Sequence, residues 1–306
     1  MLQFSQCHSQ DCTSVLRRYY MAELLHKNII GLGLVQIMGS QMRISTVASG
    51  SSGNCIYVGS DNTHILIDAG ISKKRIETGL NANDVDINDI QGIFITHEHI
   101  DHINGLGVIS RKYNIPIYAT DLTIDAIKCN SKLGAINEEL FCEIRADETF
   151  EIGDLKVKPF EISHDAVKPV AYRVECEDKA VAVATDMGKF DDYIISNLTN
   201  LDALVIEANH DVRMLLAGAY PYYLKQRILG DKGHLSNETS AKLINKILHD
   251  KLKYIMLGHL SKENNYEELA YETVKAEITM SDNQYKPGDF DIQVAKRDVN
   301  SLLYCV

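Results

Sequence analysis

Three histidines and one aspartate occupy four of the six consecutive positions in the segment 97–102, HEHIDH. Imidazole nitrogens and carboxylate oxygens are the ligands that zinc, manganese and iron take in proteins. The segment directly follows an apolar run that predicts a short buried strand. If the chain stays extended beyond this strand, His97 and His99 point to one side, while Asp101 and His102 leave in another direction as a helix begins. The spacing therefore predicts one loop that serves two adjacent cations, rather than a polar loop with chance histidines.

Two further apolar runs are followed by side chains that can bind or orient a ligand. His259 follows the run 253–257, and Glu207 and His210 follow the run 204–206. A carboxylate and an imidazole at a strand end can orient a metal ligand or transfer a proton. The alternative for the second pair is a helix cap with exposed neighbours, and the sequence leaves both interpretations open.

The segment THEHIDH, residues 96–102, resembles the H-x-H-x-D-H motif of the metallo-β-lactamase fold hydrolases. Residues 66–70, LIDAG, are similar to the strand-Asp-x-Gly turn that precedes this motif in that superfamily. Residues 184–188, ATDMG, are similar to the segment whose aspartate bridges both metals. The resemblance extends from about residue 43 to residue 296. It implies an α/β fold in which two sheets pack together between outer helices, the four-layer αββα sandwich.

The same resemblance implies ligands for two divalent metal ions, zinc or manganese. The first metal would take His97, His99 and His164, the second would take Asp101, His102 and His259, and Asp186 would lie between them. His234 competes with His259 for the last position. The place of His259 at a strand end is similar to the final motif of ribonuclease Z-like enzymes, which assigns His259 to the metal. Asp101 is also expected to be catalytic, because it would orient the nucleophile.

His234 lies in the segment 233–238, GHLSNE, at the start of an expected helix. Ribonuclease Z-like enzymes carry a similar histidine that contacts the scissile phosphate or the leaving group. A helix N-terminus also favours anions. We therefore assign His234 to the substrate as a catalytic residue that stabilises or protonates the leaving oxygen. The alternative is a plain loop residue.

A glycine-serine turn, residues 48–55, can bring backbone N–H groups close to an anion. Taken with His210, the segment 220–227 (YPYYLKQR) and the segment GHLSNE, this turn resembles the YycJ/WalJ branch of the superfamily. Members of that branch are described as exonucleases acting on double-stranded DNA from the 5′ end. The resemblance implies substrate-binding roles for Ser51, Asn54, His210, Lys225, Arg227 and Lys232. Each of the three cationic residues also has the simpler interpretation of a solvated surface charge.

Three functions compete for this site. The first is a phosphodiesterase or nuclease, in which two metals activate a shared water. The second is a carbonyl hydrolase of the lactonase, thioesterase or lactamase type, and the third is a redox di-iron protein or a metal-free binding module. Redox di-iron members have Glu where this chain has His99, and a metal-free module would not need every ligand. The segments GHLSNE and GHLS favour phosphate, so we predict a DNA exonuclease that acts from the 5′ end.

The chain has 31 basic and 42 acidic residues among its 306, a net charge of −11. This balance argues against a general basic coat for nucleic acid, although bound metals and a local cationic cluster can dominate a cleft. The stretch between Asp186 and His234 is too short for the inserted domain of larger nucleases of this fold. The grip on a nucleic acid must therefore come from loops or from a second copy of the chain in a homodimer.

The seven cysteines are scattered, without a C-x-x-C pair, which indicates a reducing compartment. The longest apolar stretch near the start, residues 29–38, is shorter than the roughly 20 residues that span a bilayer. No secretory signal is visible in the expected order of regions. We expect a cytoplasmic protein with no membrane contact.

Residues 1–41 differ from the rest of the chain because they show no clear strand pattern. Met42 could be a translation start, which makes residues 1–41 an N-terminal extension outside the core and residues 42–306 one metallo-β-lactamase-like domain. The alternative is a helix around residues 13–27 that docks on the domain. The periodicity predicts strands at 43–47, 55–59, 63–67, 92–96, 115–119, 155–161, 170–176, 180–185, 203–207, 253–258 and 291–295, and helices at 72–80, 103–113, 121–129, 211–217, 236–249 and 265–278.

Overall fold

The structure is a computed structural model that describes residues 41–306. The extension expected over residues 1–41, with its alternative of a docked helix, lies outside the described residues apart from Gln41. The domain boundary at Met42 therefore stays a prediction. Within the described part of the chain, no helix is both long enough and apolar enough to cross a bilayer.

The first of two seven-stranded sheets is built mainly from the first half of the described chain. Its order is β14 (Tyr304–Cys305), β1 (Arg43–Ala48), β2 (Cys55–Gly59), β3 (His64–Ile67), β4 (Ile90–Phe94), β5 (Ile117–Ala119) and β6 (Phe141–Glu143). Strands β1 to β3 are antiparallel neighbours, whereas β3 to β6 run parallel. The edge strand β14 pairs with β1, and Met42 and Val306 exchange backbone hydrogen bonds of 3.2 and 2.9 Å.

The second sheet repeats this plan. Its order is β13 (Asp291–Val294), β12 (Tyr254–Gly258), β11 (Ala203–Glu207), β10 (Lys179–Ala184), β9 (Val170–Cys176), β8 (Leu155–Glu161) and β7 (Phe150–Ile152). Strands β7 to β10 are antiparallel neighbours, and β10 to β13 run parallel. Each sheet therefore has one antiparallel half and one parallel half.

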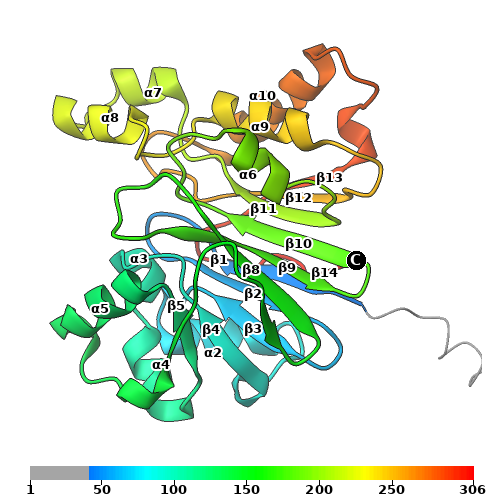
Figure 1. Ribbon diagram of the computed structural model, residues 1–306. Helices are drawn as coiled ribbons and strands as arrows, with labels where there is room; N and C mark the ends of the chain where they lie inside the picture. The colour runs from blue at the N-terminus through cyan, green and yellow to red at the C-terminus, as the bar shows by residue number, and fades with distance from the viewer. Residues whose placement is uncertain (1–40) are drawn as a thin grey trace, which may run out of the picture. The chain divides into compact units, whose positions relative to one another are not determined.

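Side chains that alternate along the strands divide the core into three layers. In β2, Ile56 and Val58 pack between the two sheets, whereas Cys55 and Tyr57 pack under helices. The outer helices are α2 (Lys73–Asn81), α4 (Leu106–Tyr113) and α5 (Asp121–Cys129) on the first sheet, and α6 (Asp192–Asn197), α9 (Asn237–Ile247) and α10 (Glu267–Met280) on the second. The domain over residues 42–306 is thus a four-layer αββα sandwich (Figure 1).

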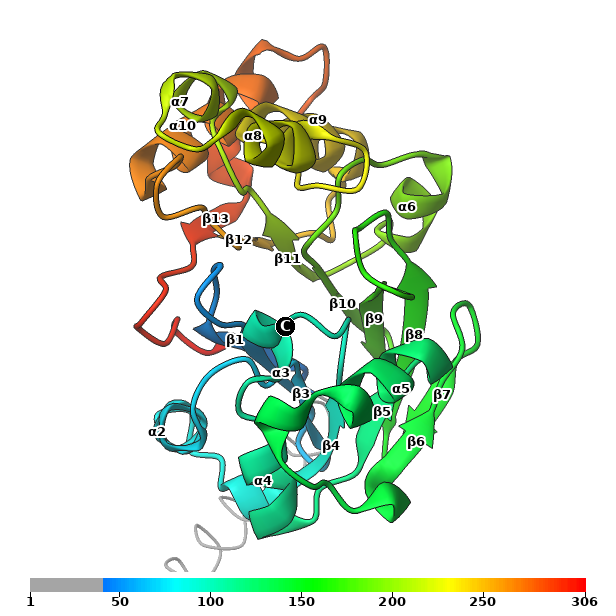
Figure 2. The same ribbon diagram turned by 90° about the vertical axis from the view of Figure 1, so that its left-hand side faces the viewer.

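Three further helices complete the fold. They are α3 (Ile100–Ile103), α7 (Val212–Ala217) and α8 (Tyr222–Leu229). Single 3₁₀ turns occur at Ile87–Asp89, Ser131–Leu133, Glu138–Leu140 and Pro287–Asp289. Figure 1 shows all three short helices on the left-hand side, and Figure 2 views the domain from that side.

The parallel strands end in polar residues. Asp68 follows β3, Asp186 follows β10, Glu207 ends β11 and His259 follows β12, while His97 lies a few residues beyond β4. Ligands of α/β sheets bind beyond the carboxyl ends of parallel strands, where neighbouring loops meet. The fold therefore brings polar side chains from distant parts of the sequence to one place.

The strands and helices predicted from the sequence are confirmed, with ends that shift by a few residues. The prediction of one continuous helix over residues 103–113 is wrong, because the helix is interrupted between α3 and α4. Gly105 N donates a hydrogen bond of 2.8 Å to Ala69 O, and a Cβ at this glycine would lie 2.1 Å from Ile71 O. The strands β6, β7 and β14 were not predicted, because they are too short for a period to be recognised. The helices α6 and α8 were also not predicted, and α8 buries no apolar face that would reveal it.

Gly70 allows the turn after β3 to lie directly against the segment HEHIDH. A Cβ on Gly70 would be 1.6 Å from Asp101 O. The same carbonyl accepts a 2.7 Å hydrogen bond from Asn54 N, and Gly70 N donates one of 2.8 Å to Asn54 O. These contacts fix the backbone at Asp101, so any larger residue at position 70 would displace it.

Gly70→Ala is expected to lower the free energy of unfolding by about 1–3 kcal/mol, the usual cost of overpacking. It should also reduce the divalent-metal content of the purified protein, because the displaced backbone belongs to Asp101. Calorimetry and elemental analysis measure the two effects. Gly288→Ala is the control, since no atom lies within 4 Å of its Cβ position. Equal stability and metal content in both variants would contradict this account.

Candidate metal centre

The loop after β4 has the shape that its spacing predicts. Helix α3 begins directly after His99, whose backbone is extended at φ −63° and ψ 145°. His97 and His99 therefore precede the helix, and Asp101 and His102 lie in its single turn. The two pairs leave the chain in different directions, as two neighbouring cation sites require.

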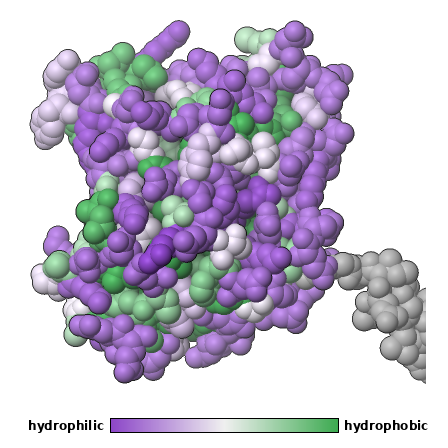
Figure 3. Space-filling view, viewed as in Figure 1, coloured by the Kyte–Doolittle hydropathy of each residue, from purple (hydrophilic) through white to green (hydrophobic). Residues whose placement is uncertain are grey.

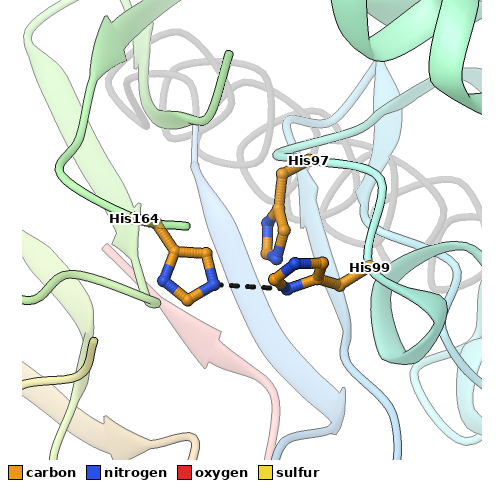
Figure 4. Close-up of side chains that lie close together, drawn as sticks. All are labelled: His97, His99 and His164. Atoms are coloured by element: carbon orange, nitrogen blue, oxygen red, sulfur yellow. Dashed lines mark hydrogen bonds between the residues drawn. The ribbon is translucent and has the colours of Figure 1, made fainter. Parts of the chain in front are cut away.

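His97, His99 and His164 form a group that we call the three-histidine cluster. Each residue offers a ring nitrogen, and these nitrogens lie within 4.8 Å of one another. His164 Nε2 is 3.3 Å from His99 Nδ1. The three rings point toward one another from the loop after β4 and from the segment after β8 (Figure 4). Three converging imidazoles are a set that zinc binds with a further position left for water or substrate.

Asp101, His102 and His259 form a second group, the mixed cluster, whose ligand atoms also lie within 4.8 Å of one another. Asp101 Oδ2 is 3.5 Å from His259 Nε2 and 3.6 Å from His102 Nε2. One carboxylate and two imidazoles suit zinc or manganese.

The carboxylate of Asp186 lies between the two clusters. Its Oδ2 is 3.3 Å from His102 Nε2, and its Oδ1 is 3.4 Å from His259 Nε2 and 3.9 Å from His164 Nε2. Its backbone is left-handed, with φ of 63°, which turns the side chain inward at the end of β10. The structure thus brings together all seven residues that the sequence assigned to metal.

Three buried atoms of these residues have no hydrogen-bond partner among the described residues. They are His97 Nε2, His259 Nε2 and Asp186 Oδ2. Buried polar atoms are normally paired, because leaving one unpaired costs about 1–3 kcal/mol. Divalent cations in the two clusters would satisfy all three atoms, so these residues fit the metals that the family resemblance implies.

The charges around the clusters also favour cations. Burial acts to lower the pKa of His102, but the carboxylates of Asp68 and Asp186 outweigh it and raise this pKa to about 9. Burial is likewise outweighed at His259, where Asp186 helps to hold the pKa well above its usual value. Burial and then the neighbouring imidazoles lower the pKa of His97 well below its usual value. The carboxylates of the mixed cluster therefore favour positive charge there, and burial favours the neutral form of His97, the form in which an imidazole binds metal.

Asp68 orients two of the histidines through hydrogen bonds, a role that the sequence analysis did not assign. This buried carboxylate accepts a 2.7 Å hydrogen bond from His102 Nδ1 and hydrogen bonds of 2.9 Å from the backbone N and Oγ1 of Thr96. Thr96 Oγ1 lies 2.9 Å from His97 Nδ1. Such contacts fix the ring orientation of metal-binding histidines. A signal was available, because Asp68 follows β3 as Asp186 follows β10.

Glu207 is fully buried and contacts two histidines at once. Its Oε1 accepts a 2.7 Å hydrogen bond from His234 Nδ1 and lies 3.1 Å from His259 Nδ1. Its Oε2 accepts from the backbone N of Met187 and Leu235 at 3.0 and 3.1 Å. Of the two interpretations left open for Glu207, the structure supports that of a carboxylate which orients a ligand.

A cleft of about 240 Å³ opens beside the mixed cluster. Its lining residues are Ser51, His99, Asp101, Asp186, Asn209, Tyr220, Leu224, Arg227, Ile228, His234, His259 and Ser261. Ser51 and Arg227 are the two residues of the expected substrate group that line it. Arg227 Nε donates to the carboxylate of Asp165, next to His164.

Two residues of the expected substrate group are buried and lie outside the lining of the cleft. Asn54 is fully buried, its Nδ2 lies 3.1 Å from His102 Nε2, and its Oδ1 accepts a hydrogen bond from Gly50 N. His210 is 1 % exposed, and its Nδ1 lies 3.3 Å from Asn209 Oδ1. Neither side chain lines the cleft. Their burial was not predicted, because neither a glycine-serine turn nor a strand end shows which of its polar residues is buried.

The two expected lysines lie outside the lining of the cleft. Lys225 Nζ donates to the carbonyl oxygens of Leu216 and Gly218 at 2.7 and 2.8 Å, so this side chain fastens α8 to the end of α7. Lys232 is exposed, in the turn between α8 and α9. Among the expected cationic residues, only Arg227 lines the cleft.

Comparison with known proteins identifies the family and the fold of this chain. Residues 63–259 match the family described as "Beta-lactamase superfamily domain". The structure is similar to YhfI, a metallo-β-lactamase fold protein from Bacillus subtilis, with a TM-score of 0.64, 15% identity and coverage of 88% of this chain and 100% of that one. It is also similar to the short form of human tRNase Z, with a TM-score of 0.57, 17% identity and coverage of 85% and 98%. These likenesses confirm the predicted fold.

Two curated relatives are far more similar in sequence. The "Exodeoxyribonuclease WalJ" of Streptococcus pneumoniae serotype 2 is 42% identical over 240 residues, which cover 78% of this chain and 89% of that protein. The "Exodeoxyribonuclease YycJ" of Bacillus anthracis is 40% identical over 241 residues, which cover 76% and 88%. The chain therefore belongs to the β-lactamase superfamily and, within it, to the family of the WalJ and YycJ proteins.

Proposed function

We propose that this chain is a metal-dependent exodeoxyribonuclease that hydrolyses double-stranded DNA from the 5′ end. One observation carries the proposal: two ligand clusters share the buried carboxylate of Asp186 beside an open cleft. The two relatives of 40 and 42% identity are named exodeoxyribonucleases, which supports DNA as the substrate. The carbonyl hydrolase considered from the sequence has no comparable support.

The ligand assignments follow from the distances within each cluster. The three-histidine cluster would hold one zinc or manganese ion, the mixed cluster would hold the other, and Asp186 would reach both. Bound cations of this kind lower the pKa of water and offset negative charge on a phosphodiester. The carboxylate of Asp101 is 21 % exposed at the cleft, so it can orient the attacking water by accepting its proton in a hydrogen bond.

We infer that His234 acts on the leaving group. Its Nδ1 donates to Glu207, so its Nε2 is the nitrogen left to face the cleft that this residue lines. A proton held there can pass to the oxygen of the departing nucleotide. Glu207 would keep the ring in the orientation that this transfer needs.

Two expectations about the context of the enzyme accompany this function. We propose a cytoplasmic location, where chromosomal DNA is the accessible substrate of a bacterial-type exonuclease. We also propose that the grip on DNA beyond the metals comes from loops or from a second copy of the chain, since the chain carries a net charge of −11.

Protein loaded with Mn²⁺ is expected to release labelled nucleotides from 5′-labelled duplex DNA, because the ligand clusters hold the cations that activate water. Removal of the metal with EDTA should abolish this release, and added Mn²⁺ or Zn²⁺ should restore it. Gel electrophoresis of the products measures both effects.

The same preparations are tested on RNA of the same sequence, on bis-p-nitrophenyl phosphate and on nitrocefin. Weak cleavage of bis-p-nitrophenyl phosphate is expected, because it is a phosphodiester without a base to hold it. Cleavage of nitrocefin with no cleavage of any phosphodiester would overturn the proposed function.

Asp101→Ala is expected to lower the rate of DNA cleavage by at least roughly 100-fold, the lower end of what a positioned proton acceptor contributes. The fold should survive, because this side chain is partly exposed. Single-turnover kinetics and circular dichroism measure the two effects. Asp125→Ala, on the exposed side of α5, is the control and should keep full activity. A fully active Asp101→Ala protein would contradict the catalytic role of Asp101.

Glu207→Gln is expected to weaken metal binding about 10- to 100-fold, as the loss of an outer-shell partner usually does. The amide keeps the shape of the side chain but lacks the charge that faces His234 and His259. Titration of metal-free protein with Zn²⁺ in competition with a chelator measures the affinity. Glu272→Gln, on the exposed surface of α10, should bind as the wild type does, and an equal affinity in the Glu207→Gln protein would contradict the orienting role.

A further inference from the structure

Helix α8 is an unusual element beside the cleft. None of its eight residues is fully buried, and its first two, Tyr222 and Tyr223, are 77 % and 74 % exposed. Figure 3 shows weakly hydrophilic side chains, drawn in pale lilac, over the upper left end where Figure 1 places this helix. Large aromatic side chains held in water beside a cleft are typical of a binding surface.

The two tyrosines lie on different sides of α8. Leu224, Arg227 and Ile228 line the cleft, and residues four positions apart on a helix are neighbours. Tyr223 is four positions before Arg227, so it lies on the flank of the face that lines the cleft. Tyr222 is rotated a further 100° by the helical period and lies on the side away from the cleft.

Contacts of Lys225, Arg227 and Ile228 hold the middle and the C-terminal half of α8 in a fixed position relative to the metal centre. Lys225 Nζ donates to two carbonyl oxygens at the end of α7. The carbonyl of Ile228 accepts a 3.0 Å hydrogen bond from His234 N. Arg227 Nε donates to Asp165, whose Oδ1 is 3.4 Å from His164 Nε2. The helix is therefore tied to the three-histidine cluster and to His234 rather than free to swing.

Arg227 remains available to a ligand in spite of its ion pair. Its side chain is 50 % exposed, and a guanidinium has five N–H donors, of which the contact with Asp165 takes one. The other donors can bind a phosphate oxygen at the mouth of the cleft. The cation that lines the cleft and the exposed ring of Tyr223 are thus neighbours on the surface of α8.

We propose that Tyr223 is the platform on which a base of the nucleic-acid substrate stacks, while Arg227 binds a phosphate beside it. This inference rests on the proposed nuclease function. An enzyme with a net charge of −11 gains little from general attraction to a polyanion. Stacking on an aromatic ring needs no charge and accepts any base, as an enzyme that degrades DNA of any sequence requires.

The matched pair Tyr222→Ala and Tyr223→Ala tests this placement. Tyr223→Ala should lower kcat/KM on duplex DNA by roughly 5- to 150-fold, which at 1.4 kcal/mol per factor of ten corresponds to 1–3 kcal/mol for one stacked base. The loss should lie mainly in KM, because stacking holds the substrate before the reaction. Tyr222→Ala should be unchanged on DNA, and both variants should keep wild-type hydrolysis of bis-p-nitrophenyl phosphate and an unchanged melting temperature.

Two further measurements separate stacking from other roles of Tyr223. Tyr223→Phe and Tyr223→Trp should retain activity on DNA, since the ring and not the hydroxyl is required. A series of duplexes carries one abasic nucleotide at successive positions near the cleaved end. The wild type should cleave one member of this series poorly, the one that lacks the stacked base. The Tyr223→Ala protein should cleave that substrate and intact DNA at the same rate, because loss of the ring and loss of the base remove the same contact.

The outcomes separate this inference from the function on which it rests. Wild-type protein that hydrolyses no DNA would overturn the nuclease function itself. If the wild type hydrolyses DNA and Tyr223→Ala has the same kcat/KM, only the stacking role of Tyr223 is overturned. The same holds if Tyr222→Ala lowers kcat/KM as much as Tyr223→Ala does. The second result would indicate that the whole exposed end of α8 serves another purpose, such as contact with a protein.

Discussion

The metal centre depends on how buried negative charge is neutralised. Asp68, Asp186 and Glu207 are each at most 2 % exposed, and a buried carboxylate without compensation would cost several kcal/mol. Imidazoles provide part of the compensation, since His102, His234 and His259 each lie within 3.4 Å of one of these carboxylates. Cations would provide the rest. The stability of this region and its affinity for metal should therefore be coupled, because both rest on the same charges.

Three of the residues that meet at the metal centre have a backbone conformation that costs conformational energy. Asp68, Asp186 and His259 have left-handed φ angles of 64°, 63° and 54°, a conformation that costs about 1–3 kcal/mol for a residue other than glycine. Asp68 and His259 directly follow the last residue of a strand, and Asp186 comes one residue later, so the chain turns sharply at the sheet edge and the side chain faces the centre. Glu207 needs no such turn, because it is itself the last residue of β11. Tertiary contacts must hold the strained turns in place.

The sequence was most informative where the chemistry is local. The segment 97–102 reveals four ligands in one loop, whereas Asp186 was found only through a resemblance to family motifs, and His259 was assigned to the metal in the same way. The orienting contacts of Glu207 could not be predicted, because its partners lie in separate loops that meet only in the fold. The burial of Asn54 was not predicted, because the sequence does not reveal which polar residue of a turn is buried. The fold was predictable because the family motifs imply it and the short apolar runs agree with it. Helix α8 was not predictable, because it buries no apolar face.

The pairing of β1 with β14 has a consequence for synthesis of the protein. These strands come from opposite ends of the described chain, at Arg43–Ala48 and Tyr304–Cys305. While a ribosome makes the residues between them, the outer ladder of β1 has no strand to pair with. An unpaired edge of this kind invites association with other nascent chains, and a contact so distant in sequence forms slowly. Chaperones that shield nascent sheets would be expected to raise the yield of this domain.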